Sequence, residues 1–160
     1  MGSLERVIKL GDTKKFKSFI IEGQFYQAIE LIKDIDFSKV KEDLIELAFD
    51  TGSIAPYTFT CYLLIQKENS ELHELASEIL TLPLCYLTDA YTMGLFHAKK
   101  ALELKPNDIS LQEYLLLYHT LPDKLLSDQE AEQLAKNILK FDPNNSAALN
   151  ALKDIKNSIL

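Results

Sequence analysis

The sequence predicts an all-α protein, an array of about nine antiparallel helices arranged in hairpins over residues 1–160 as a single domain. Its apolar residues are mainly Leu and Ile at helical spacing, whereas strands favour alternating β-branched residues. Two similar phrases, "HAKKALELKPND" and "LAKNILKFDPNN", place Pro143 143 − 106 = 37 residues after Pro106. Such a period is typical of stacked helix-turn-helix units. We therefore expect either a right-handed solenoid of hairpins or a compact helical bundle.

Five helices are expected in the first half of the chain. The first ends at Gly23, and "QFYQAIELIKDI" follows as its antiparallel partner. Ser38 is the predicted cap of the third helix, and Asn69 or Ser70 that of the fifth. The fourth, "YTFTCYLLIQK", is apolar nearly all round, which predicts a central helix covered on several sides.

The second half begins with an apolar connector, "LPLCYL", expected either to pack beneath the hairpins or to belong to a binding surface. Thr88 or Asp89 is then the expected cap of a helix in which Gly94 allows a neighbour to approach closely. The next helix should start at Asp108. The two last helices have their own start signals: Ser127 and Glu130 form a capping box pattern, and Asn145 or Ser146 can cap the final helix.

The segment "EGQFYQAIELI" resembles the turn between the two helices of a tetratricopeptide repeat. Similar hairpin phrases occur around Ala28, Ala98 and Ala135, at intervals of 98 − 28 = 70 and 135 − 98 = 37 residues. The spacing indicates a diverged repeat of about 35 residues with one eroded copy. Because the full repeat signature is incomplete in every copy, the resemblance implies a tetratricopeptide-like fold and no more.

Charge is unevenly distributed along the chain, whose net charge is −7. The segment from Glu42 to Asp89 holds nine acids and only Lys67 as a base, a net 1 − 9 = −8. Such a segment repels nucleic acid and attracts basic surfaces. We expect its carboxylates to point mostly outward and to bind a basic partner, with tyrosines as aromatic anchors. The predicted partner-binding residues are Glu42, Asp43, Glu46, Asp50, Glu71, Glu74, Glu78, Tyr57, Tyr62 and Tyr86.

The sequence contains little that indicates catalysis. Cys61, His73, Cys85 and His97 follow one another at intervals of 12 residues, whereas zinc ligands usually come in close pairs. There is no "GxSxG" motif, no Gly-rich phosphate loop and no second His after "HELAS". We therefore predict no enzyme activity, no bound metal and no cofactor.

The location of the protein is expected to be cytoplasmic. No apolar run is long enough to span a membrane, and the N-terminal residues lack a secretory signal. The two cysteines are too few for a disulfide framework. We expect no membrane partner, and the oligomeric state is left open.

The runs "LAFDTGSIAPYTFTCYLLIQKENSELHELASEIL" and "PLCYLTDAYTMGLFHAKKALEL" resemble bacterial immunity proteins of polymorphic or contact-dependent toxin systems. The resemblance implies binding and neutralisation of a cognate toxin domain. An acidic inhibitor would suit a basic, nuclease-type toxin. The alternative is a tetratricopeptide-like adaptor or chaperone that holds a peptide in a concave groove, where bases would serve: Lys99, Lys100, Lys136 and Lys140.

Overall fold

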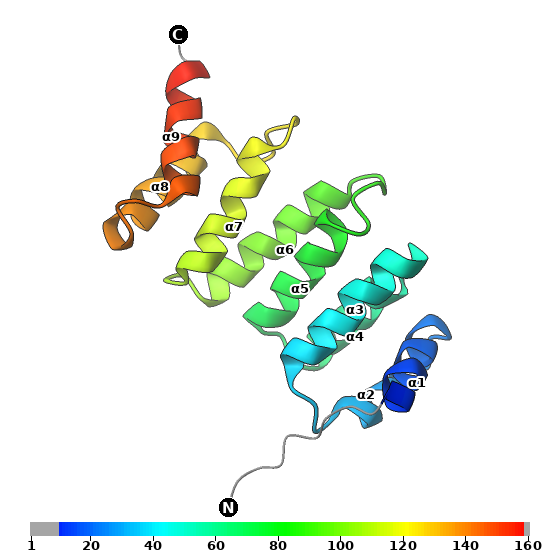
Figure 1. Cartoon of the computed structure of the whole chain (residues 1–160). Coiled ribbons are helices and arrows are strands. Elements are labelled where there is room, and N and C mark those ends of the chain that lie inside the picture. Colours follow the sequence, from blue (N-terminus) through cyan, green and yellow to red (C-terminus); the bar gives the residue numbers. More distant parts are fainter. Residues whose placement is uncertain (1–9, 159–160) are drawn as a thin grey trace, which may run out of the picture.

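A computed structural model describes residues 10–158, which form nine α-helices and no strand (Figure 1). The predicted all-α fold is confirmed. None of the helices in this range is long and apolar enough to cross a membrane. The helices are α1 (Leu10–Ile21), α2 (Phe25–Ile32), α3 (Phe37–Thr51), α4 (Ala55–Gln66), α5 (Ser70–Thr81), α6 (Ala90–Leu104), α7 (Ile109–Thr120), α8 (Asp128–Phe141) and α9 (Ser146–Ser158).

Most helix starts lie where the local sequence predicts them. Side-chain oxygens of Asn69, Asp108 and Asn145 accept backbone N–H groups in the first turns of α5, α7 and α9. Ser127 and Glu130 form the reciprocal capping box of α8. The predicted cap of α3 is wrong by two residues, because Asp36 occupies that position and accepts the Ser38 N–H at 2.8 Å.

Most helices lie beside the next helix in the chain, and α1 and α9 lie at opposite ends of the row (Figure 1). Helices two apart also touch, as α3 does with α5 and α7 with α9. Lys41 near the start of α3 reaches Glu74 and Glu78 of α5, while Gly52 at the end of α3 meets Tyr86, which follows α5. Both contacts advance in the same direction, so α3 and α5 run parallel.

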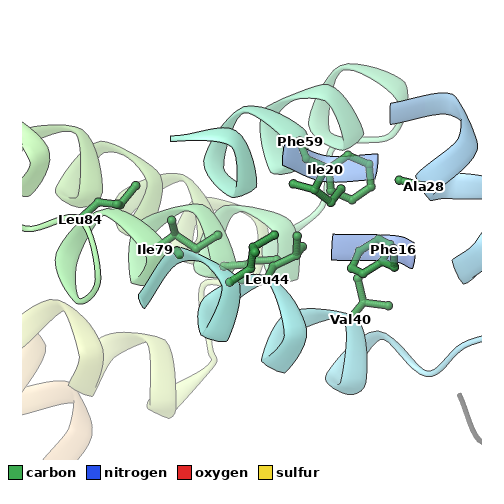
Figure 2. Packing of buried hydrophobic residues seen from close by; sticks show 11 residues of the cluster. Phe16, Ile20, Ala28, Val40, Leu44, Phe59, Ile79 and Leu84 are labelled. Carbon is green, nitrogen blue, oxygen red and sulfur yellow. The ribbon is translucent and has the colours of Figure 1, made fainter. Parts of the chain in front are cut away.

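Buried apolar side chains form two clusters. The first joins α1 to α5, and Figure 2 shows Phe16, Ile20, Leu44 and Phe59 in it. Phe59 is fully buried, and the edge of its ring meets Phe16 at a centroid distance of 5.9 Å. Burial of such a side chain contributes roughly 2–3 kcal/mol. The second cluster joins α6 to α9 through small and aliphatic residues.

Between the two clusters, α5 presents a buried polar stripe: Ser70, His73, Ser77 and Thr81. This polar seam faces α6 and α7. Ser70 Oγ donates to the Ala101 carbonyl at 2.9 Å, and Ser77 Oγ donates to the Gly94 carbonyl at 2.8 Å. The spacing of three and four residues keeps the stripe on one helical face.

The α6 side of the seam is lined by Gly94, Ala98 and Ala101, which are buried. A Cβ on Gly94 would lie 2.6 Å from Thr81 Oγ1 and 2.8 Å from the Tyr118 hydroxyl. The prediction that Gly94 permits close approach is therefore confirmed. Small residues bring the α6 backbone close enough to accept hydrogen bonds from α5 side chains.

The two apolar segments are covered to different extents. Helix α4 meets α1, α3 and α5, as expected of a helix covered on several sides, and Pro56, Phe59 and Thr60 are buried. Its last turn is uncovered, since Ile65 is 85% exposed. In the connector after α5, Leu84 is buried whereas Tyr86 is exposed, so the segment both packs and contributes to the surface.

Candidate functional site

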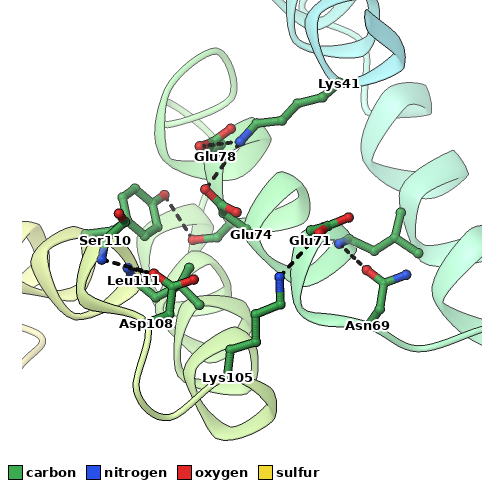
Figure 3. Close-up of polar contacts among 12 residues, drawn as sticks. Lys41, Asn69, Glu71, Glu74, Glu78, Lys105, Asp108, Ser110 and Leu111 are labelled. Carbon is green, nitrogen blue, oxygen red and sulfur yellow. Dashed lines mark hydrogen bonds and ion pairs between the residues drawn. The ribbon is translucent and has the colours of Figure 1, made fainter. Parts of the chain in front are cut away.

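The predicted acidic surface lies on α3 and α5, and we call its carboxylates the acidic face: Glu42, Glu46 and Asp50 from α3 and Glu71, Glu74 and Glu78 from α5. Figure 3 shows the α5 members with the lysines that meet them. Lys41 Nζ lies 3.3 Å from Glu74 and 2.9 Å from Glu78. Lys105 Nζ, from the end of α6, lies 3.3 Å from Glu71.

Two lysines also meet the α3 carboxylates. Lys17 of α1 lies 2.5 Å from Glu46, and Lys39 lies 3.2 Å from Glu42. Lys17 lowers the pKa of Glu46 through its hydrogen bond and its charge. The negative charge of the segment is therefore partly neutralised in the fold, because lysines from outside the acidic segment pair with its carboxylates.

Asp43 was predicted to point outward, and this is wrong. Its side chain is only 1% exposed and pairs with Lys39 at 3.3 Å. Position 43 lies three residues after Val40 and four before Leu47, on the buried stripe of α3. Because its side chain is buried, Asp43 cannot be reached by another protein and is a structural residue. Its Oδ2 atom accepts no hydrogen bond.

Glu74 and Glu78 are also less available than predicted. The Glu78 side chain is 18% exposed, and Lys41 covers it. Burial raises the pKa of Glu78, although the hydrogen bond from Lys41 opposes this effect. Both carboxylates bind Lys41 and so join α5 to α3. Replacing either glutamate by a basic residue would place two positive charges side by side.

Asp50 is the exception on the acidic face. It is exposed in the last turn of α3, and no basic side chain pairs with it in the described part of the chain.

The three predicted tyrosine anchors lie in different environments. Tyr62 is half-buried, with its ring centroid 5.5 Å from that of Phe25. Tyr57 is half-buried and bonds to His97. Tyr86 is 64% exposed, and its hydroxyl donates to the Gly52 carbonyl at 2.7 Å. Only Tyr86 presents most of its ring to a partner.

The structure also brings together side chains that sequence spacing kept apart, in a chain of hydrogen bonds across α4, α5 and α6. Glu68 Oε1 lies 2.9 Å from His73 Nε2, and His73 Nδ1 lies 2.9 Å from His97 Nδ1. The Tyr57 hydroxyl completes the chain at 3.1 Å from His97 Nε2. Both imidazoles are buried.

One set of tautomers satisfies every contact with neutral imidazoles. His73 donates from Nε2 to the Glu68 carboxylate, His97 donates from Nδ1 to His73, and Tyr57 donates to His97 Nε2. Burial first, and then repulsion from His73, lower the pKa of His97 to about 4. His97 is therefore neutral at pH 7.

This network is poorly suited to nucleophilic catalysis. Cys61 hydrogen-bonds to Tyr57, but burial raises the pKa of its thiol, which keeps it protonated and weakly nucleophilic. Burial also raises the pKa of Tyr57. Within residues 10–158, no group of three potential ligands from His, Cys, Asp and Glu is placed to hold a metal ion. The hydrogen bonds of the network join α4, α5 and α6.

A groove of about 860 Å³ lies between α6 and α8. Leu102, Leu115 and Leu126 provide apolar lining, and Lys99 and Glu130 face each other across it at 2.6 Å. Lys99 and Ser127 hold the pKa of Glu130 at about 2. The other predicted groove bases are also bonded: Lys100 to Glu103, Lys136 to Glu132, and Lys140 to Asn137.

Comparison of the chain with protein-family models, with curated proteins and with solved structures found no match.

Proposed function

We propose that this chain is a non-enzymatic binding protein that docks onto a cognate, basic toxin domain and neutralises it in the cytoplasm, as an immunity protein does. The observation that supports the proposal is the surface at the end of α3, where Asp50, which no base within residues 10–158 pairs with, lies next to exposed Phe49 in the sequence. Aromatic residues are enriched in the cores of protein interfaces, and polar residues surround them at the rim. The net charge of −7 favours encounter with a basic protein.

The test is to purify the protein together with the product of the gene beside its own, and to measure binding and the partner's toxicity. A basic partner that elutes with the chain and loses its activity supports the proposal. The association rate should fall as salt increases, because steering by net charge is screened. A partner that remains fully active in the complex, or the absence of a complex, contradicts it.

A charge-reversal variant sharpens the test. Asp50→Lys changes an exposed carboxylate that has no lysine partner in the described chain, so folding should be unaffected. Asp154→Lys on α9 is the matched control, since this exposed carboxylate lies at the far end of the row. We expect Asp50→Lys to slow association more than Asp154→Lys, although both alter net charge equally.

The groove between α6 and α8 supports a second candidate function, an adaptor that holds a peptide. Four leucines line it, of which Leu102 and Leu134 are partly exposed and would accept an apolar side chain, and its volume suits a short peptide segment. Leu102→Lys would place a charge in that lining. If peptide binding is the function, this change abolishes it while Asp50→Lys has no effect, which is the reverse of the pattern expected for the inhibitor.

A further inference from the structure

Large apolar side chains are exposed together where α3 and α5 end. Phe49 is 60% exposed, Tyr86 64%, and Leu82 and Ile54 48% each. With Asp50 they form what we call the end patch: Phe49, Asp50, Ile54, Leu82 and Tyr86.

The parallel course of α3 and α5 explains why these residues gather. Lys41 lies beside Glu74 and Glu78, and two to three turns later Gly52 lies beside Tyr86. Phe49 is one turn before Gly52, and Leu82 is one turn after Glu78. The two residues therefore occupy corresponding levels on neighbouring helices.

The patch is held in place before any partner arrives. The Tyr86 hydroxyl donates to the carbonyl of Gly52, which closes α3 in the left-handed region at φ 62°. Leu84 is fully buried in the first apolar cluster and fixes the connector beneath Tyr86. An aromatic ring that is already positioned loses little conformational freedom on binding, so its contacts contribute more to affinity.

Charge indicates what the patch can bind. Asp50 has no basic partner in the described chain, and between residues 42 and 98 the sequence has one base, Lys67. Lys67 follows the far end of α4, whereas Ile54 precedes its first residue. Within residues 10–158 no base pairs with Asp50, so in this part of the chain its carboxylate is open to a cation from another molecule.

We propose that the end patch is the docking point for the basic toxin domain, which would place an apolar side chain against Phe49 and Tyr86 and a Lys or Arg against Asp50. This inference rests on the proposed function and specifies where and how the partner binds. The glutamates bound by Lys17, Lys41 and Lys105 lie outside it, because their charges are already paired. Replacing one cation by another at such a pair changes the free energy little.

The experiment uses the full chain and the purified product of the adjacent gene, with affinity measured by calorimetry and rates by surface plasmon resonance. Phe49→Ala and Tyr86→Ala should each raise Kd by about 30-fold or more, the usual threshold for a hot spot. Asp50→Asn should raise Kd about 5-fold or more and weaken the salt dependence of association. Ile65→Ala is the matched control, since Ile65 is equally apolar, 85% exposed and on α4; its Kd should stay within about 3-fold of wild type.

Circular dichroism melting verifies that each variant is folded. If Tyr86→Ala has a lower melting temperature than wild type, Tyr86→Phe replaces it in the test, because this variant keeps the ring and loses only the hydrogen bond to Gly52. Tyr86→Phe should bind the partner more tightly than Tyr86→Ala. If wild type binds and inactivates the partner but the Phe49, Asp50 and Tyr86 variants all match Ile65→Ala, the end patch is wrong, while the loss of the partner's activity still supports neutralisation through another surface. If wild type does not bind the partner, both are wrong.

Discussion

Gly94→Ala is expected to destabilise the fold, although alanine favours helices by about 1 kcal/mol over glycine. The new Cβ would lie 2.6 Å from Thr81 Oγ1, 2.8 Å from the Tyr118 hydroxyl and 3.5 Å from the Ser77 carbonyl. Thr81 and Tyr118 hydrogen-bond to each other at 2.7 Å, so both would have to move. Overpacking of this kind costs about 1–3 kcal/mol, and a lost buried hydrogen bond adds about 1. The net expectation is a loss of roughly 1–3 kcal/mol.

Urea unfolding followed by circular dichroism measures this change, and each kcal/mol should lower Tm by roughly 2–4 °C for a chain of this size. The double variant Gly94→Ala with Thr81→Ala provides the control. Removing the Thr81 hydroxyl relieves one of the two close contacts, so the combined loss should be smaller than the sum of the single losses. Unfolding of Gly94→Ala at or above the wild-type urea midpoint would refute the proposed close approach of α5, α6 and α7.

The remaining predictions concern packing, pH and metal. Ala98→Leu and Ala135→Leu should each lower stability by about 1–3 kcal/mol, since both alanines are buried between helices, and a wild-type melting temperature in either would contradict this. Stability should fall as pH drops from about 6.5 to about 4: His97 has a folded pKa near 4, below its unfolded value, so the unfolded chain binds more protons in that window. The slope should approach about 1.4 kcal/mol per pH unit and should flatten in His97→Asn, which urea midpoints across pH would reveal. Chelators should change neither stability nor binding, and stoichiometric zinc in protein purified without added metal would overturn this.

Local sequence signals predicted the helices well because helix starts depend on nearby residues. Asn69 and Asp108 cap helices with their own side chains, and Ser127 needs only Glu130 one turn away. The cap of α3 was misplaced because both Asp36 and Ser38 are good capping residues, and the N–H of Ser38 is the donor in the observed bond. Such choices within one turn are difficult to make from propensity alone.

Buried polar residues were harder to predict, although periodicity held some of the information. Asp43 lies on the same helical stripe as Val40 and Leu47, but its carboxylate favoured an outward interpretation. Ser77 and Thr81 likewise repeat at helical spacing on a buried face of α5. Their partner Tyr118 lies about 40 residues away, and only the fold brings it within 2.7 Å.

Acidic residues that cluster along the sequence do not form an equally acidic surface in the fold. The segment from Glu42 to Asp89 has a net charge of −8. Four lysines from outside the segment pair with its carboxylates: Lys17, Lys39, Lys41 and Lys105. Together with these lysines the net charge is −4. Long-range attraction depends on the remaining net charge, and so it governs the association rate and its salt dependence. Short-range affinity depends on groups that the fold leaves unsatisfied, because a carboxylate already bound to lysine gains little from a second cation. Neutralising a paired acid such as Glu71 should therefore change mainly the association rate, whereas truncating Phe49 or Tyr86 should change mainly the dissociation rate.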